Sequence, residues 1–267
     1  QATSQDLLHW TPKQIVLAGD KRYDKDILQF YAMNGYLARG DLVIGFAKNL
    51  HDDWRADGAP QGAFGIGSSS LVWTRDGETW IRDREVFFGP DPAPGVWDHA
   101  HAWIDEQVPV GDDVYLYYGG YRWGHKHNRF EDRQIGLVKM LRDRYVAREA
   151  GAEGGRHRTP PLTLAASQLT INASIAGELQ VGIVDADGGV LPAFDWVSLR
   201  GDKVDHQVTF QGNLRQLAET PIRIEFRLRD AQLFGFDLKD DAAGSSATPA
   251  SWNLVCSSDN DLYRVLT

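Results

Sequence analysis

The chain has few of the residues that would indicate a disulfide scaffold, a zinc site or a membrane span. Among its 267 residues there is one cysteine, Cys256, which cannot form a disulfide within the chain. No Cys and His spacing resembles a structural zinc site. No apolar run approaches the roughly 18 residues of a membrane-spanning helix. We therefore expect neither a disulfide framework nor a membrane partner, and the redox compartment stays open.

The chain also lacks the basic runs that a nucleic-acid partner requires. Lys and Arg number 28 against 37 Asp and Glu, so the formal net charge is -9. Neutralising phosphates takes clustered basic side chains, which do not occur here. We predict no nucleic-acid partner and an uncharged substrate. The first residues also lack a basic segment followed by an apolar one, and we interpret the N-terminus as a processed or truncated end.

Helical periodicity is nearly absent, whereas strand patterns are frequent. β-branched, aromatic and leucine side chains alternate or run together between Gly and Asp residues, which is typical of strands. Two complete sets of four strands with hardly any helix favour β-propeller blades. The first set is residues 27–36, 42–47, 69–73 and 84–88, and the second is 99–107, 114–121, 134–140 and 145–148.

A short turn pattern recurs along the first half of the chain. Asp6 precedes Trp10, Asp76 precedes Trp80, and a weaker copy surrounds Asp143, so the three aspartates follow one another at nearly equal intervals. This spacing is typical of a repeated four-stranded unit, because Asp can bond its own downstream backbone in a tight turn. The alternative is a set of ordinary hairpin turns. A closed propeller needs at least about four blades, and about two and a half are visible, so we expect an incomplete ring or one completed by another segment or chain.

Composition divides the chain into four parts, and the fold class we predict is all-β. Residues 1–150 are assigned to propeller blades. Residues 151–161, rich in Gly, Pro and polar side chains, are assigned to a linker. The period stays near two in residues 162–238, which predicts a β-sandwich. Ala, Gly, Ser and Thr dominate much of residues 239–267, which we interpret as a peripheral tail.

The best candidates for catalysis are Asp26 and Asp98, which lie close to one repeat length apart, where the first strand of each predicted blade begins. First strands line the central funnel of a propeller, so both carboxylates would reach the axis. Glycosidic cleavage needs such a pair, one to protonate the leaving oxygen and one to activate water or attack the sugar. The alternative is that each aspartate caps its own strand. Asp24 is an alternative to Asp26, and Glu106 is a further candidate acid.

Substrate-binding candidates cluster near the second of these aspartates. His99 and His101 have the i, i+2 spacing that places two side chains on one face of a strand. Trp97 precedes them, and His125 lies in the polar loop of residues 124–133. A divalent metal held by two His and Asp98 is the alternative, but no third firm ligand is visible. We predict direct sugar contact, no metal and no organic cofactor.

These motifs resemble a known family. Ser4-Gln5-Asp6-Leu7-Leu8-His9-Trp10, the Asp-Gly-x-x-Trp turn at residues 76–80, Trp97-Asp98 and Tyr117-Tyr118-Gly119-Gly120 are similar to the later blades of five-bladed propeller glycosidases of the β-fructosidase and arabinanase/xylosidase type. Segments such as Leu169-Thr170-Ile171-Asn172 resemble the β-sandwich that trails those propellers.

The resemblance implies a hydrolase that cleaves a poly- or oligosaccharide by carboxylate acid/base chemistry. Family members draw their carboxylates from successive blades, the first ones N-terminal. We expect this chain to start after those blades, so its catalytic set would be incomplete, and the Arg-Asp-Pro and Glu-Cys motifs of the fructosidases are absent. The alternative function is a non-catalytic carbohydrate-binding or assembly module.

Overall fold

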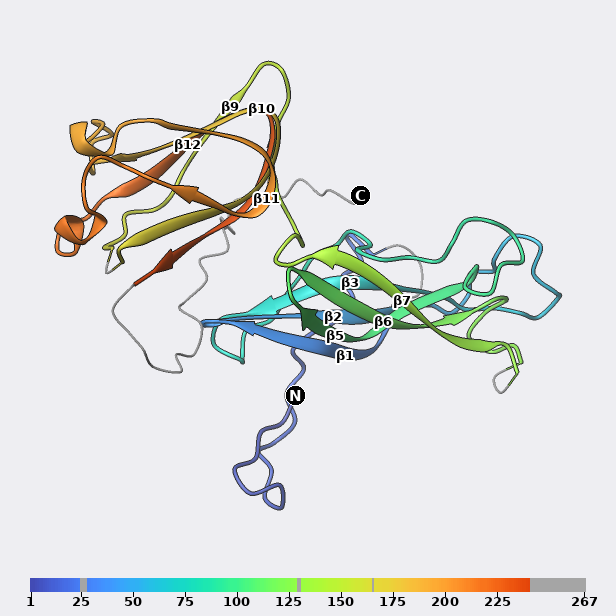
Figure 1. The fold of residues 1–267 in the computed structure, drawn as a ribbon. Coiled ribbons are helices and arrows are strands. Elements are labelled where there is room, and N and C mark those ends of the chain that lie inside the picture. Colours follow the sequence, from blue (N-terminus) through green and yellow to red (C-terminus); the bar gives the residue numbers. More distant parts are fainter. Residues whose placement is uncertain (25–27, 129–130, 165, 241–267) are drawn as a thin grey trace. The chain divides into compact units, whose positions relative to one another are not determined.

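The protein is nearly all β in the computed structural model, in agreement with the all-β class expected from the sequence (Figure 1). The structure describes residues 1–24, 28–128, 131–164 and 166–240. Within these ranges the only helices are two short 3-10 turns, η1 (Pro192–Phe194) and η2 (Leu214–Leu217), and neither has the length or apolar character to cross a membrane. The chain divides into two compact units, residues 1–140 and 141–267, which we call unit 1 and unit 2.

Unit 1 contains one seven-stranded sheet with the order β1-β2-β3-β5-β6-β7, in which β4 pairs with β3. Strands β1 to β4 form an antiparallel meander, because each pairs with the next one in the chain. Strands β3 and β5 are parallel and share one bridge, from Gly67 to His101. The strands are β1 (Leu28–Arg39), β2 (Leu42–His51), β3 (Ile66–Thr74), β4 (Ile81–Arg82), β5 (His101–Val110), β6 (Asp113–Tyr121) and β7 (Arg133–Leu141).

Two Gly-Asp loops reverse the chain in unit 1. Gly40 and Asp41 connect β1 to β2, and Gly111 and Asp112 connect β5 to β6. Both glycines have positive φ, 62° and 63°. Two-residue hairpin loops require this conformation, and glycine adopts it without steric cost. The interval between the two loops is close to that between the turns at Asp6 and Asp76, so β1–β2 and β5–β6 are repeated hairpins.

The repeated turn around Asp6 and Asp76 has the same hydrogen bonds in both copies. Each aspartate Oδ1 accepts from the backbone N–H groups two and three residues later, at 2.7 to 2.9 Å. A hydroxyl two residues before the aspartate accepts from the N–H that follows it, at 2.8 Å for Ser4 and 3.0 Å for Thr74. The side chains close the turn from both sides, so these two copies are one structural repeat.

The third copy, at Asp143, differs. Here the aspartate itself has positive φ, 63°, and its side chain is buried. The residue two positions earlier is Leu141, which has no hydroxyl to bond the turn. The following segment, residues 145–148, does not form the expected fourth strand of the second set. Instead β8 (Arg148–Ala150) pairs with β12 of unit 2.

The strand expected at residues 84–88 is also displaced. The chain pairs with β3 earlier, in β4, and the N–H of Asp83 still bonds to β3 at 2.9 Å. The Asp83 carboxylate then accepts from the N–H of Glu85 at 3.1 Å, which starts a local turn. Pairing resumes only where Phe87 donates to the carbonyl of Ser69 at 2.8 Å. A side-chain turn therefore interrupts the ladder that the sequence predicts.

Unit 2 contains a five-stranded sheet with the order β11-β10-β12-β8, in which β9 also pairs with β12. Besides β8, its strands are β9 (Gly155–Arg158), β10 (Gln168–Val184), β11 (Val197–Val208) and β12 (Arg223–Lys239). Strand β9 lies within residues 151–161, where composition predicts a linker. Strands β10 and β12 have 17 residues each. The sequence pattern predicts two strands in place of each, 168–172 and 177–184 for β10 and 222–228 and 231–237 for β12.

The core of unit 2 follows from alternation along these long strands. In β10 the side chains of the buried cluster alternate from Leu169 to Ile175 and again from Leu179 to Ile183, and this alternation passes through a register shift between Ile175 and Glu178. In β12 it passes Asp230, whose positive φ of 42° marks an irregular point in the strand. The buried cluster is Leu164, Leu169, Ile171, Ala173, Ile175, Leu179, Val181, Ile183, Phe194, Leu199, Val208, Leu214, Leu217, Ile222, Ile224, Phe226, Leu228, Ala231, Leu233 and Phe236.

Candidate functional site

Most of the predicted site residues lie on or next to strands β5 and β6, since Trp97, Asp98 and His99 precede β5 and His125 follows β6. The two faces of this strand pair separate them. Directly opposite residues of an antiparallel pair point to the same face, and successive residues alternate. His101 lies opposite Tyr121, and Ile104 lies opposite Tyr118. Tyr118 and Tyr121 are three residues apart on β6, so their side chains point to opposite faces, and each pair marks one face. We call them the histidine face and the tyrosine face.

The tyrosine face holds Asp98 and Trp97, which shortly precede β5. The Asp98 side chain is buried, and its Oδ2 accepts a hydrogen bond of 2.7 Å from the Tyr118 hydroxyl. The Trp97 and Tyr118 rings stack with 5.4 Å between centroids, and a Cβ at Gly120 would lie 2.4 Å from the Trp97 ring. Burial, followed by the Asp98 carboxylate, raises the pKa of Tyr118. The Asp98 carboxylate is thus the hydrogen-bond acceptor of the buried Tyr118 hydroxyl.

His99 lies in a turn before β5 and not on a strand face. Its N–H donates to the carbonyl of Val96 at 3.3 Å, and β5 begins two residues later. The expectation that His99 and His101 share one strand face is therefore wrong. The ring nitrogens of His99 lie 2.8 Å from the Asp91 carbonyl and 3.0 Å from the Asp57 carbonyl. The His99 ring thus connects the loop around Asp91 with the loop around Asp57.

The histidine face carries a cluster of Tyr31, His101, Trp103, Tyr121 and His125, which we call the aromatic-histidine cluster. The His101 ring stacks on Tyr121 with 4.1 Å between centroids and meets Trp103 edge-on at 3.9 Å. His125 lies 5.6 Å from His101, and Tyr31 lies 4.8 Å from His125 and 4.9 Å from Trp103. Two predicted binding residues, His101 and His125, therefore meet.

Two glycines make room for these two histidines. A Cβ at Gly67 would lie 2.2 Å from Cδ2 of His101, so only glycine lets the ring pack against the β3 backbone. A Cβ at Gly65 would lie 2.8 Å from the Cβ of His125, and the N–H of His125 donates to the Gly65 carbonyl at 3.0 Å. The start of the loop after β6 is thereby fixed against the loop before β3.

His101 is fully buried, and neither ring nitrogen has a hydrogen-bond partner in the part of the chain that the structure describes. Burial disfavours the imidazolium and is the main cause of a pKa of His101 well below its usual value. Positive charge at His125, Arg133 and Lys48 acts in the same direction. The Gly119 backbone opposes the shift without reaching hydrogen-bond geometry. His101 is therefore uncharged and forms the buried side of the aromatic-histidine cluster.

A polar border surrounds the cluster where it meets solvent. Tyr31 is 48% exposed and the Asp105 side chain 51% exposed, whereas Trp103 and the Lys48 side chain are nearly buried, at 6% and 11%. Lys48 forms an ion pair with Oδ1 of Asp105, and its Nζ lies 5.7 Å from the centre of the Trp103 ring. Asn34 donates to the same Asp105 oxygen at 3.4 Å. We call Tyr31, Trp103, Asn34, Lys48 and Asp105 the rim patch.

The rim patch was not found from the sequence. The signal for Asp105 was present, because His101, Trp103 and Asp105 have the i, i+2, i+4 spacing of one strand face. The residues that β1 and β2 contribute have no such signal. They reach β5 through the packing of unit 1, which one strand's pattern does not encode.

The remaining predicted carboxylates have other environments. Asp26 lies outside the described residues. Both oxygens of Asp24 lie 2.6 and 2.8 Å from Nη2 of Arg82, and both side chains are less than a tenth exposed. Glu106 is exposed and accepts from the N–H of Gln107 at 3.0 Å. Within the described ranges, no group of three or more His, Cys, Asp or Glu side chains could hold a metal ion.

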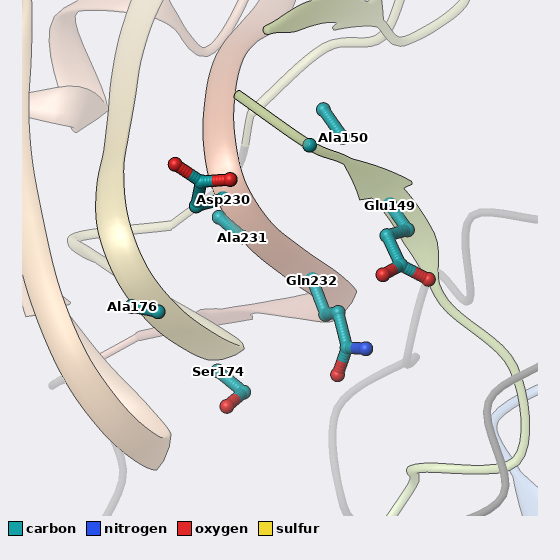
Figure 2. Close-up of a pocket in the computed structure, with 8 residues that line it drawn as sticks. Glu149, Ala150, Ser174, Ala176, Asp230, Ala231 and Gln232 are labelled. Carbon is teal, nitrogen blue, oxygen red and sulfur yellow. The ribbon is translucent and has the colours of Figure 1, made fainter. Parts of the chain in front are cut away.

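Unit 2 has shallow hollows on its sheet. The one in Figure 2, of about 320 Å³, crosses a row in which Glu149 of β8, Gln232 of β12 and Ser174 of β10 lie side by side. Figure 2 shows Glu149 and Asp230 on opposite sides of the hollow, with small alanine side chains between them. A second hollow, of about 380 Å³, is lined by arginines.

A scan against models of known protein families and a search of curated proteins each found no match. Function is therefore inferred from the chemistry of the side chains described above.

Proposed function

We propose that unit 1 binds carbohydrate at the rim patch. The observation that carries the proposal is the contact of Tyr31 and Trp103, 4.9 Å between centroids, beside Asn34, Lys48 and Asp105. The half-exposed Tyr31 ring, which packs against the buried Trp103, offers an apolar face to the C–H side of a sugar, while amide, ammonium and carboxylate groups bond its hydroxyls. A partly apolar surface with a few convergent polar groups is typical of small-molecule sites.

Asp105 retains hydrogen-bonding capacity for a ligand. A carboxylate has about four lone-pair sites, and both Lys48 and Asn34 contact Oδ1. Oδ2 faces Gly119, where even an added Cβ would stay 3.6 Å away. The missing side chain at Gly119 leaves space next to Oδ2. A sugar hydroxyl bonded there would lie beside the Trp103 ring.

Glycoside hydrolysis of a poly- or oligosaccharide is the second candidate function. Asp105, half-exposed beside aromatic rings, favours it, because a carboxylate in that position can act as acid, base or nucleophile. Hydrolysis needs a second carboxylate about 5 Å away for retention or about 6.5 to 9.5 Å away for inversion. Asp26 keeps this role from the sequence analysis. The Tyr118 hydrogen bond argues against Asp98.

For the architecture, we propose propeller blades in unit 1 and a β-sandwich in unit 2. The blades are supported by the β1 to β4 meander and by the nearly equal intervals at which the Asp turns and the Gly-Asp loops recur. The sandwich is supported by long strands enclosing one core. A crystal structure of the protein would test both through its blade count and sheet packing.

The binding proposal is tested with Tyr31→Ala and Tyr36→Ala. Both tyrosines are on β1 and both are 48% exposed, but Tyr36 contacts Trp80 instead of the cluster. Calorimetric titration with fructan, arabinan and xylan oligosaccharides should show affinity for at least one. We expect Tyr31→Ala to weaken it about tenfold, as losing an aromatic contact of about 1.5 kcal/mol implies. Tyr36→Ala should leave it unchanged.

Absence of binding to every oligosaccharide, or equal losses in the two tyrosine variants, would contradict the proposal. Chromogenic glycosides assayed alongside separate the two candidate functions. Turnover that disappears in Asp105→Asn supports hydrolysis, whereas binding without turnover supports a binding module.

A further inference from the structure

We propose that unit 2 binds an oxyanion between Arg156 of β9 and Arg227 of β12. The chemical class is a carboxylate, sulfate ester or phosphate ester group. The place is the hollow of about 380 Å³ on the unit 2 sheet, which Arg229 also lines and which Glu153 and Glu178 border. This inference does not depend on the sugar-binding proposal for unit 1, since it concerns other residues in the other unit.

The strand register places two positive charges directly opposite each other. Arg156 pairs with Arg227 across β9 and β12, and Arg227 pairs on its other side with Gln180 of β10. The three side chains therefore project from the same face in one row. Like charges directly opposite destabilise a sheet. An anion bound between the two guanidinium groups would remove that repulsion.

The buried Glu225 carboxylate next to this pair already has a hydrogen-bonded partner, Arg158. Glu225 is 2% exposed, and its Oε2 accepts from Nε of Arg158 at 2.6 Å. Its Oε1 lies 3.8 Å from Arg156 and 3.9 Å from Arg227, so it forms long ion pairs that partly offset their repulsion but no hydrogen bond with either. Among the described residues these are the only carboxylate contacts of Arg156 and Arg227, and Arg229 has none. The guanidinium N–H groups facing the hollow are thus available.

Arg227 is also held in position for a ligand. Its guanidinium lies 3.6 Å from the centre of the Trp196 ring, and that ring packs against Gly182, where a Cβ would lie 3.1 Å from it. Stacking fixes the guanidinium plane while its edge keeps the N–H donors that bind carboxylate or phosphate in pairs. The neighbouring turn has Gly154 and Gly155, which add no side chains to the hollow.

The charges favour a single anionic group over a polyanion. Three arginines face two glutamates in the lining, and Glu178 already accepts from the Ser198 hydroxyl at 3.0 Å. The local excess is therefore one positive charge, within a chain of formal net charge -9. A nucleic acid needs many such contacts. One carboxylate or ester group needs only the arginine pair.

Calorimetric titration of the whole protein with glucuronate, sulfate and phosphate tests the inference, with ionic strength balanced by chloride and glucose as the neutral control. The variants are Arg156→Gln and Arg227→Gln. Arg200→Gln is the matched control, because Arg200 is exposed on β11 of the same sheet and outside the hollow. We expect saturable binding that weakens about tenfold in each hollow variant, as losing one charge-assisted hydrogen bond implies, and no change in Arg200→Gln.

Preference for glucuronate would identify an acidic sugar, and preference for sulfate or phosphate an ester; either supports the site. Binding that is absent, does not saturate, or persists unchanged in both hollow variants overturns it. Should Arg227→Gln fold poorly, as seen from its far-UV circular dichroism, Arg156→Gln decides, because its side chain is 63% exposed. Since the sugar tests use unit 1 variants, failure here leaves that proposal untouched.

Discussion

The two faces of the β5–β6 hairpin use polar groups in opposite ways. On the tyrosine face, the buried Asp98 carboxylate has a partner within the fold, the Tyr118 hydroxyl at 2.7 Å. On the histidine face, the buried His101 ring has none among the described residues, and its aromatic neighbours continue to the half-exposed Tyr31. Both faces are aromatic, but only the histidine face opens to solvent beside charged groups.

The difference teaches how to separate structural from functional polar residues in this fold. A buried polar group normally finds its hydrogen bond, and one left without a partner costs stability. Asp98 follows this rule, because the Tyr118 hydroxyl donates to it, so its burial is explained without a ligand. His101 does not follow it. The ring packs against Trp103 of the rim patch, the surface for which we propose a sugar ligand.

The largest expected effect is that of Asp98→Ala on the free energy of unfolding. The substitution leaves the buried Tyr118 hydroxyl without an acceptor, which costs about 1 to 3 kcal/mol, and removes packed atoms as well. We expect a loss of about 3 kcal/mol in urea unfolding, with unchanged sugar affinity. Tyr118→Phe removes the same hydrogen bond from the other side, so the double variant should lose less than the sum. Unchanged stability with abolished hydrolysis would instead make Asp98 catalytic.

The next effect compares a glycine from each face. In Gly67→Ala the new Cβ would meet His101 at 2.2 Å, and in Gly120→Ala it would meet Trp97 at 2.4 Å. Overpacking of this kind costs about 1 to 3 kcal/mol, so we expect about 2 kcal/mol from each in thermal unfolding. Titration with oligosaccharide should then divide them. Gly67→Ala displaces the His101 ring, which packs against Trp103 of the rim patch, and weakens binding, while Gly120→Ala does not.

The sequence could predict the strands of this module better than its faces. The segments expected at 114–121 and 134–140 match β6 and β7 within one residue at each end. Which residues share a face depends on where β5 starts, and the turn closed by His99 moves that start to His101. Asp98 and His101 are near neighbours in the sequence, and this turn places them on opposite faces.

In unit 2 the sequence pattern likewise fails to predict how far a strand continues. Asp230 is a turn-favouring residue in sequence, so the segments before and after it are predicted as two strands. In the structure the chain continues through it with positive φ, and cross-strand pairing resumes at Ala231. The partner strand β10 decides the outcome, because its own register shift accommodates the irregularity. Tertiary pairing of this kind is not visible in a single-sequence pattern.

A smaller effect distinguishes the two faces by pH. The pKa of His101 is lowered in the folded state, so its contribution to stability is complete above the unfolded pKa of about 6.5 and is lost as pH falls below it. Each pH unit costs up to about 1.4 kcal/mol, and we expect a loss of about 1 kcal/mol by about pH 5.5 in urea unfolding. His101→Phe should reduce this dependence of stability on pH. A smaller dependence should remain, because burial also lowers the pKa of His157.

On the tyrosine face the dependence is reversed. The pKa of Tyr118 is raised, so stability is complete below the unfolded value of about 10 and is lost as pH rises above it. His101→Phe should not alter this alkaline limb, and Tyr118→Phe should remove it. An acid limb as steep in His101→Phe as in the unsubstituted protein would show that groups other than His101 carry it.

The smallest effect concerns the cations beside the histidine face. The Arg133 guanidinium lies 4.3 Å from the centre of the Tyr121 ring, and its charge lowers the pKa of His101. Arg133→Gln should cost about 0.5 kcal/mol, the value of an exposed cation–π contact, and raise the midpoint of the acid limb slightly. Lys139→Gln is the control on the same strand, since Lys139 lies 5.1 Å from the Tyr115 ring at the far end of β7. Equal shifts would indicate a general charge effect, whereas a shift with Arg133 alone would place the titrating group under Tyr121, where the His101 ring stacks.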